Sequence, residues 1–328
     1  PNENLRWERV QMTNMALDFE SKSGRFSGSF EYFIKNGLDL FGTIPMAPSS
    51  GVVSYRGNFA SARTRGLDMI LKGRLIQKGL KWDLSLIYNH VKDKVTGYET
   101  LASVSNYLAF AGGSDLIYPF EGRPLFSIYS YEWGGLNPDN GNPMGVLNGE
   151  PSDNYSAVFS ETTPESIIFN GAARPTSVGT ISNNLAYGRF SLSANITYRF
   201  GYYFRRNSIM YNDLFNGNLG HEDFGGRWQN PGDELTTQIP SMPLGLNANR
   251  DNMYRYSEIL VERGDHVRLQ DVRISYLPNK TRGFSRVELY AFVNNVGLLW
   301  KKTDIPIDPD YRSMRPLRSF ALGLKIDL

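Results

Sequence analysis

The three histidines, His90, His221 and His266, are the residues whose chemistry would be easiest to recognise, as acid-base groups or metal ligands. They lie far apart in the sequence, in a predicted strand, a polar stretch and the start of another predicted strand. Metal sites normally gather their ligands into a cluster that outer hydrogen bonds hold in place. We therefore expect three separate polar positions and no shared site.

Carboxylates are grouped in the motifs DIPIDPD (304–310), GDELTT (232–237) and HED (221–223). An oxygen-rich loop can bind Ca²⁺, but prolines separate the aspartates of the first motif, which is more typical of turns. Paired carboxylates hydrolyse glycosides only at a defined separation in space, which closeness in sequence does not fix. The sequence has no cysteine, phosphate-binding glycine loop or nucleophile elbow. It predicts no catalytic centre, no metal site and no cofactor, and so no enzyme.

Two long polar stretches combine aromatic with amide side chains, a composition that suits sugars or peptides through ring stacking and directed hydrogen bonds. Packing of the loops against one another is the alternative role, and we favour it for Trp228, which lies in the motif RWQNPGD (227–233). The candidates for contact with a substrate or partner are Tyr129, Tyr131, Trp133 and Asn137 in the first stretch and Phe224, Trp228, Gln229 and Asn230 in the second.

Strands must position these stretches, because the remaining sequence alternates apolar and polar residues. The segment FSLSANITYRF (190–200) does so over its whole length, which gives a strand one apolar and one polar face. A change of phase at Gln270 and Asp271 predicts a bulge in one strand. The aromatic run 198–204 predicts part of an aromatic girdle. The last strand places five residues on one face, which we expect to contact lipid: Phe320, Leu322, Leu324, Ile326 and Leu328.

About nine or ten such strands are predicted, many of them longer than the five or six residues usual in soluble sheets. Short turns at 21–25, 76–81 and 186–190 join them in pairs, whereas the polar stretches at about 96–174 and 205–264 are long. Long strands with short turns at one end and long loops at the other are typical of outer-membrane barrels. Helical periodicity is essentially absent. We predict an all-β protein, an antiparallel transmembrane β-barrel with long extracellular loops, over the more common β-sandwich.

Several motifs, in the same order along the chain, resemble the SusC/RagA-like TonB-dependent transporters of the Gram-negative outer membrane. The most specific are RWQNPGDE (227–234) and GDHVRLQDVRISYLP (264–278). Segments 5–41, 173–202 and 287–301 extend the resemblance through nearly the whole chain. One departure is the final residue, Leu328, where such barrels commonly end on an aromatic residue.

The resemblance implies that residues 1–328 are the C-terminal portion of a barrel in the 22-strand size class, with the plug domain and the N-terminal barrel strands absent. It implies TonB-dependent import of oligosaccharides or oligopeptides through the outer membrane, together with a SusD-like surface lipoprotein. The TonB complex would act through the missing N-terminal part. Outer-membrane lipids, the barrel-assembly machinery and a glycan or peptide ligand are the other implied partners. The net charge of +2 gives no indication of a nucleic-acid partner.

Two other functions stay open at this point. A passive outer-membrane pore would lack TonB coupling, and a soluble glycan-binding β-sandwich would bury its apolar faces between two sheets. Mean hydropathy is −0.38 and no apolar run approaches the roughly 18 to 20 residues of a spanning helix. A helical membrane protein is therefore excluded.

Overall fold

The computed structural model describes residues 5–45, 49, 51, 54–98, 102–109, 117–218, 220–278, 286–312 and 317–327. The chain divides into two compact units, which are described separately. Unit 1 comprises Pro1–Gly97, Pro175–Tyr202 and Gly264–Leu328, and unit 2 comprises Tyr98–Arg174 and Tyr203–Arg263. No helix in the described part of the chain is both long enough and apolar enough to cross a membrane.

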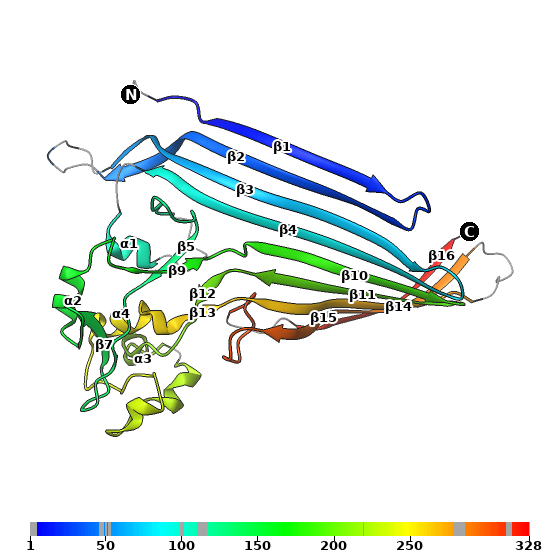
Figure 1. Cartoon of the computed structure of the whole chain (residues 1–328). Coiled ribbons are helices and arrows are strands. Elements are labelled where there is room, and N and C mark those ends of the chain that lie inside the picture. The colour runs from blue at the N-terminus through cyan, green and yellow to red at the C-terminus, as the bar shows by residue number, and fades with distance from the viewer. Residues whose placement is uncertain are drawn as a thin grey trace. The chain divides into compact units, whose positions relative to one another are not determined.

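Unit 1 is a nine-stranded sheet with the order β1-β2-β3-β4-β10-β11-β14-β15-β16, antiparallel wherever its register is described (Figure 1). The bounds of the strands are β1 Arg9–Glu20, β2 Phe26–Pro45, β3 Ser54–Ile76, β4 Leu80–Tyr98, β10 Ser177–Tyr187, β11 Phe190–Phe200, β14 His266–Tyr276, β15 Arg286–Lys301 and β16 Ser319–Asp327.

Short turns join β1 to β2, β3 to β4 and β10 to β11 at one end of these strands, which we call the turn end. At the opposite end, the loop end, β4 and β11 continue into unit 2. The predicted bulge is confirmed, because Asn195 pairs with Asp271 while Ile196 pairs with Leu269, so that Gln270 is left over. The extra residue restores the phase of the alternation on β14.

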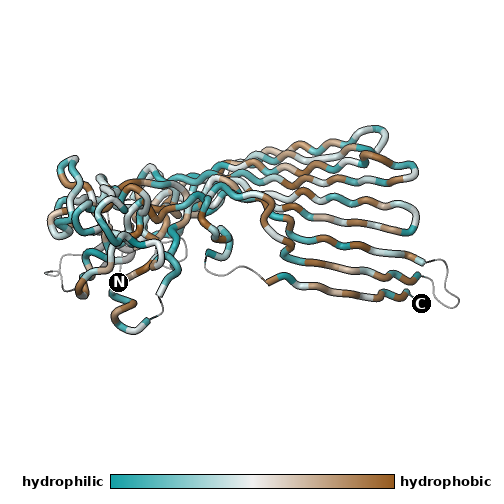
Figure 2. The backbone as a smooth tube through the Cα atoms, turned by 90° about the horizontal axis from the view of Figure 1, so that it is seen from below, coloured by the Kyte–Doolittle hydropathy of each residue, from teal (hydrophilic) through white to brown (hydrophobic). Residues whose placement is uncertain are grey.

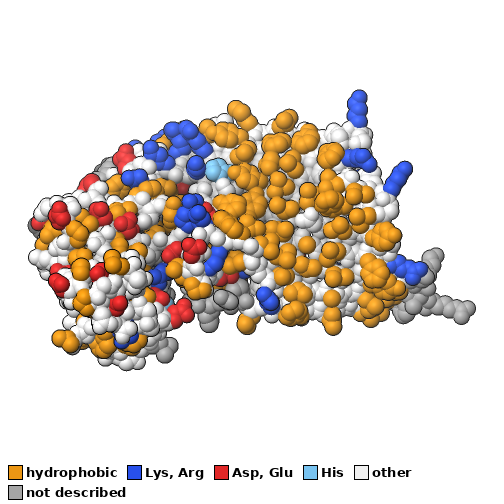
Figure 3. Space-filling view, turned by 60° about the horizontal axis from the view of Figure 1, so that its bottom comes forward, with side chains coloured by type: hydrophobic (Ala, Val, Ile, Leu, Met, Phe, Trp, Pro, Cys, Tyr) orange, Lys and Arg blue, Asp and Glu red, His pale blue; other side chains and the backbone are white. Residues whose placement is uncertain are grey.

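Apolar and polar residues alternate along the strands (Figure 2). Each strand therefore contributes its apolar residues to one face of the sheet, which we call the apolar face. Residues that pair across strands point to the same side. The register pairs Leu192 with Ile274, Ile274 with Ala291, and Ala291 with Leu322. The apolar side chains of neighbouring strands therefore join into one continuous surface (Figure 3).

This apolar face is too large to be left in water. Contiguous apolar patches on soluble monomers are usually no larger than about 300–600 Å², whereas this surface extends over the strands of the whole sheet (Figure 3). On β16, the candidate lipid contacts Phe320 and Leu322 are 73% and 88% exposed, and Leu324 and Ile326 are 57% and 43% exposed. Leu328 lies outside the described residues. Exposure of this kind on a regular strand is typical of a lipid-facing wall.

Aromatic rings mark both ends of the apolar face. At the loop end, ring centroids lie 6.5 Å apart for Tyr88 and Tyr198, 5.3 Å for Tyr198 and Phe200, and 6.1 Å for Phe200 and Trp300. At the turn end, Phe190 packs on a neighbouring ring of β14 at 4.9 Å. From Phe190 to Tyr198 a strand advances about 26 Å at about 3.3 Å per residue. That distance matches the apolar band of about 25 Å in transmembrane barrels.

The predicted girdle segment 198–204 is only partly correct. Tyr198 and Phe200 lie on the apolar face, but Tyr202 is 3% exposed and Phe204 is not exposed at all. Tyr203 packs against the buried pair Ile128 and Ala173 of unit 2. The strand ends at Phe200, so the alternation that places side chains on the apolar face does not continue beyond it.

Unit 2 is built from short elements, in contrast to the sheet. In the described residues its helices are α1 Val104–Ala109, α2 Tyr155–Glu161, α3 Tyr211–Phe215 and α4 Ala248–Arg255, with 3-10 turns η2 Glu222–Gly226, η3 Asp233–Leu235 and η4 Glu258–Leu260. Its strands are β5 Ser127–Ser130, β6 Gly135–Leu136, β7 Pro143–Leu147, β8 Glu150–Ser152, β9 Ile168–Ala172, β12 Tyr203–Arg205 and β13 Val261–Arg263. The sequence predicted no helices here, because helices of five to eight residues are too short to produce a clear period.

Candidate functional site

Of the predicted loop candidates, Tyr129 lies in a core of unit 2. It is 4% exposed, and its ring centroid lies 5.3 Å from that of Tyr107 and 5.8 Å from that of Phe169. Burial raises the pKa of its hydroxyl to about 12. These contacts make Tyr129 a packing residue of the loops.

Arg205 ties the two chain segments of unit 2 together. Its guanidinium donates hydrogen bonds to the carbonyl oxygens of Leu108, at 2.6 Å, and Tyr129. Burial lowers the pKa of Arg205 to about 10. The guanidinium also lies 5.2 Å from the centroid of the Tyr256 ring, and a buried cation is costly to separate from such partners. This residue therefore stabilises unit 2 and was not predicted, because a single arginine in a polar stretch carries no pattern.

Trp228 has the packing role that its motif predicted. It is 7% exposed, and its indole nitrogen donates a 3.0 Å hydrogen bond to the Glu234 carboxylate. The ring lies flat against Gly141, where a Cβ atom would come within 2.4 Å of it. Gly141 also has a φ of +68°, a conformation in which glycine is favoured. The contact between Trp228 and Gly141 thus packs the second long polar stretch against the first.

Gln229 and Asn230 follow in an exposed turn. Their backbone N–H groups donate to the same carboxylate oxygen of Asp233, both at 2.9 Å. These hydrogen bonds lower the pKa of Asp233. Both amide side chains remain in solvent. The side chains of Gln229 and Asn230 are therefore free to contact a substrate or a partner protein.

Replacement of Trp228 by alanine is expected to destabilise unit 2 by about 3–5 kcal/mol, the usual cost of removing a large buried ring. Limited proteolysis of the folded protein should show earlier cleavage within 203–263. Leu235, which is 85% exposed, provides the control, since Leu235→Ala should leave the cleavage rate unchanged. Equal resistance of the Trp228 variant and the parent would contradict the packing role.

Tyr131, Trp133 and Asn137 are half-buried. The ring of Tyr131 stacks on Phe159 at 5.0 Å, and the indole nitrogen of Trp133 donates to Gln238 at 2.9 Å. Burial raises the pKa of Tyr131 to about 12. Tyr131 also lines a cavity of about 200 Å³. This volume is below the roughly 300–1,000 Å³ of typical ligand sites, so it would hold at most a small part of an oligomer.

Phe224 lies beside a different group. Its ring packs edge-on against that of Tyr211, with the ring centroids 6.4 Å apart. The guanidinium of Arg227 lies over the Phe224 ring, 4.0 Å from its centroid. The structure connects the two candidate groups through α4, where Tyr254 contacts both the ring of Trp133, at 6.0 Å, and Ser208. The eight candidates therefore do not form one pocket but are distributed over a folded unit.

A polar network around Arg250 was also not predicted. Arg250 is 3% exposed, and its guanidinium donates to Asn142 at 2.7 Å and to the carbonyl of Ser241 at 2.6 Å. The Ser241 hydroxyl in turn donates to the carbonyl of Asn140 at 2.6 Å. Asn140 and Asn142 lie about a hundred residues before Ser241 and Arg250 in the sequence, so the network depends on the tertiary structure that brings the two segments together.

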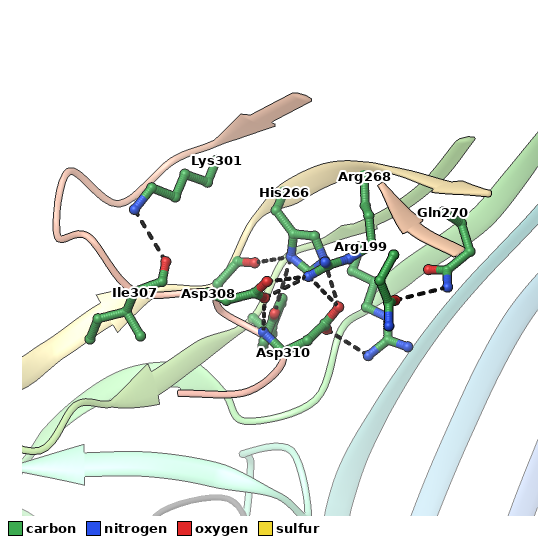
Figure 4. A network of polar contacts seen from close by, with 11 residues as sticks. Arg199, His266, Arg268, Gln270, Lys301, Ile307, Asp308 and Asp310 are labelled. Atoms are coloured by element: carbon green, nitrogen blue, oxygen red, sulfur yellow. Dashed lines mark hydrogen bonds and ion pairs between the residues drawn. The ribbon is translucent and has the colours of Figure 1, made fainter. Parts of the chain in front are cut away.

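The most concentrated charges of unit 1 lie at the loop end of β11 and β14 (Figure 4). One Arg268 nitrogen donates to both Asp308 oxygens, at 2.5 and 2.7 Å, and to Asp310 at 3.3 Å. Arg199 donates to the other Asp310 oxygen at 2.8 Å. The aspartates of DIPIDPD therefore hold the segment after β15 against the strand ends. We call Arg199, His266, Arg268, Asp308 and Asp310 the rim cluster.

His266 is 1% exposed, and both of its ring nitrogens face acceptors. Nδ1 lies 2.8 Å from the carbonyl oxygen of Gly264, and Nε2 lies 3.1 Å from the carboxylate of Asp310. Burial opposes ionisation of Asp310, but the hydrogen bond from His266 and the neighbouring positive charges outweigh it and lower its pKa. The Tyr202 hydroxyl also lies 3.3 Å from Nδ1, so three neighbours fix the orientation of the His266 ring.

His266 belongs to a charged cluster and is not the isolated polar position that the sequence predicted. His90 contacts the Ser177 hydroxyl at 2.7 Å, and His221 accepts from the Asp223 backbone at 3.1 Å. Within the described ranges, no group of three or more His, Cys, Asp or Glu side chains could hold a metal ion. Asp308 and Asp310 are engaged by the rim cluster.

The face opposite the apolar face is polar and carries ion pairs and hydrogen bonds between strands. Arg273 donates to Glu288 at 3.0 Å, and Asn195 donates to Asp271 at 2.8 Å. Such pairs suit a wet surface, which a transmembrane barrel has on its inside. Long antiparallel strands, one apolar face with aromatic ends and one polar face together define the wall of an outer-membrane β-barrel.

Comparison with known proteins gives the same class, an outer-membrane β-barrel. No protein-family model matches the chain. TonB-dependent receptor SusC from Bacteroides thetaiotaomicron is 23% identical over 350 residues, which cover 99% of this chain and 32% of the relative. TonB-dependent receptor P39 from Formosa agariphila is 23% identical over 346 residues, which cover 90% of this chain and 32% of the relative. The chain thus spans about a third of the length of these relatives.

Among solved structures, the RagAB peptide transporter superposes with a TM-score of 0.72 at 17% identity, over 99% of this chain and 36% of that chain. This likeness confirms the barrel fold. The resemblance to SusC/RagA-like TonB-dependent receptors is confirmed as well, and it extends over nearly the whole chain. These similar proteins are receptors and transporters of the outer membrane and not enzymes, as the sequence predicted.

Proposed function

We propose that this chain is the C-terminal part of the barrel of a TonB-dependent import receptor. The observation that carries the proposal is the nine-stranded sheet with one apolar face, matched over 99% of its length by the RagAB peptide transporter and by SusC. The strands would form part of the wall of the pore, and unit 2 would supply extracellular loops. A plug domain and the remaining strands would come from the rest of the receptor.

The imported solute would be an oligosaccharide or an oligopeptide. A peptide is supported by the name of RagAB as a peptide transporter and importer. Either solute would suit the half-buried aromatic and amide side chains Tyr131, Trp133 and Asn137, through stacking and hydrogen bonds. A SusD-like lipoprotein would cover the receptor, and the TonB complex would drive import.

The dependence of import on TonB gives a direct test of the proposed function. In cells that carry the complete receptor, uptake of labelled peptides and oligosaccharides should be lost when TonB is deleted, while the receptor remains in the outer membrane. A passive pore would continue to conduct without TonB. Separately, the protein should require detergent for extraction, because its apolar face contacts lipid. Release by a salt wash would support the soluble sandwich instead and contradict the barrel.

A further inference from the structure

The turn end of the sheet carries a set of positive charges that the import function does not use. The described turns and the residues close to them hold six exposed cations, with two exposed acids, Glu20 and Asp83, nearby. The six make no ion pair with any described residue. We call them the basic rim: Lys22, Arg25, Arg74, Lys78, Lys81 and Arg189.

Several arginines elsewhere on unit 1 form ion pairs. At the loop end, Arg9 pairs with Asp39 at 2.6 Å, and the arginines of the rim cluster pair with aspartates at 2.5–3.3 Å. On the polar face, Arg273 pairs with Glu288 at 3.0 Å. None of these pairs involves a member of the basic rim, so the charges of the basic rim can meet an external anion.

The basic rim borders directly on the apolar face. Exposed aromatic residues stand next to its members in sequence, with Phe26 after Arg25 and Phe190 after Arg189, exposed by 51% and 60%. Lys and Arg side chains stand along the turn-end edge of the apolar face, next to hydrophobic side chains (Figure 3). Aromatic rings followed by cations are the arrangement found where a protein passes from acyl chains to headgroups.

A groove in the apolar face begins beside this edge. It has a volume of about 570 Å³ and opens on β14, β15 and β16. Its walls are almost entirely apolar, with Phe190, Ile274, Leu289, Leu322 and Leu324 among the lining residues. Arg189 precedes the first of these in sequence, so a molecule with an apolar tail and an anionic head could contact both.

We propose that the basic rim binds the anionic headgroups of phospholipids in the membrane leaflet at the turn end, while an acyl chain lies in the apolar groove. The chemistry is that of Lys and Arg donors on phosphate oxygens, supported by the attraction of a negatively charged lipid surface. Each basic residue near such a surface favours association by about five-fold, and salt screens the effect. The proposal rests on the lipid-facing sheet and is independent of TonB-dependent import.

The test compares anionic with zwitterionic lipid at the surface of the complete receptor. Spin-labelled phosphatidylglycerol and phosphatidylcholine would be added to the receptor reconstituted in phosphatidylcholine vesicles, and electron spin resonance gives their relative association. We expect a several-fold preference for phosphatidylglycerol at low salt that falls toward one in 1 M NaCl. Equal association of the two lipids at low salt would overturn the proposal, and would point to another anionic partner for the rim.

Two matched triple variants separate the rim from total charge. Lys22→Gln, Lys78→Gln and Lys81→Gln together should abolish most of the preference. Lys35→Gln, Lys92→Gln and Lys94→Gln, which remove three other exposed lysines away from the turn end, should preserve it. All six lysines are at the surface, so neither variant should affect folding. Loss of the preference in both variants, or in neither, would contradict the assignment to the basic rim.

Discussion

Ala194→Arg is expected to destabilise the folded barrel by about 2–4 kcal/mol, the cost measured for an arginine on the lipid face at the bilayer midplane. Ala194 lies on the apolar face of β11, four residues from Phe190 and four from Tyr198. These two rings mark the ends of the apolar face, so position 194 is at its centre. The arginine would have to leave water without gaining a partner.

Ser182→Arg is the matched control, because it introduces the same side chain at the same depth on the neighbouring strand β10. Ser182 pairs with Asn195 on one side and Ser85 on the other, and all three lie on the polar face without a cation opposite. We expect a change within about 0.5 kcal/mol, as for most surface substitutions. The measurement is equilibrium unfolding by urea of the complete receptor in lipid vesicles. A similar loss in both variants would show that the sheet has no lipid-facing side.

Arg268→Ala should cost about 3–5 kcal/mol, the usual effect of removing one partner of a buried ion pair. The side chains of Arg268 and Asp308 are 3% and 7% exposed, and Asp308 would remain as a buried, unpaired carboxylate. Asp310 would lose one of its two arginine neighbours. We therefore expect the segment after β15 to detach from the strand ends before the sheet unfolds.

Hydrogen exchange of residues 302–312 is the direct measurement for this variant. The double variant Arg268→Met with Asp308→Asn should recover most of the loss, since it removes both charges and keeps an acceptor for the Asp310 N–H group. Arg9→Ala provides the exposed control, because a surface pair such as Arg9 with Asp39 contributes about 1 kcal/mol or less. Unchanged exchange in Arg268→Ala would mean that the rim cluster does not hold the segment.

The rim cluster gives the aspartates of DIPIDPD a role that their sequence did not predict. From the sequence these prolines and aspartates were expected to form turns, and in the folded chain arginine and histidine side chains also contact the oxygens of Asp308 and Asp310. The motif gives no sign of this, because these partners lie forty or more residues away on β14. The same holds for Arg205 and Arg250, each of which donates to loop segments distant in sequence.

The sequence by itself determined the sheet. Alternation of apolar and polar residues has a period of two, which any strand expresses whatever its neighbours are, so the two faces could be predicted from each segment alone. The bulge at Gln270 was predictable for the same reason, since an extra residue shifts the phase locally. The short turns were predictable too, and glycine stands in each described one, with positive φ at Gly24, Gly79 and Gly188.

Only the tertiary structure decided the roles of the loop residues. Tyr129, Trp228 and Tyr202 are buried because partners from remote segments cover them, and aromatic composition alone fits a binding surface equally well. The short helices of unit 2 were not predictable, because each is stabilised by packing and caps and not by a long periodic pattern. A period of two is a local property of the chain, whereas burial and ion pairing depend on which distant residues the fold brings together.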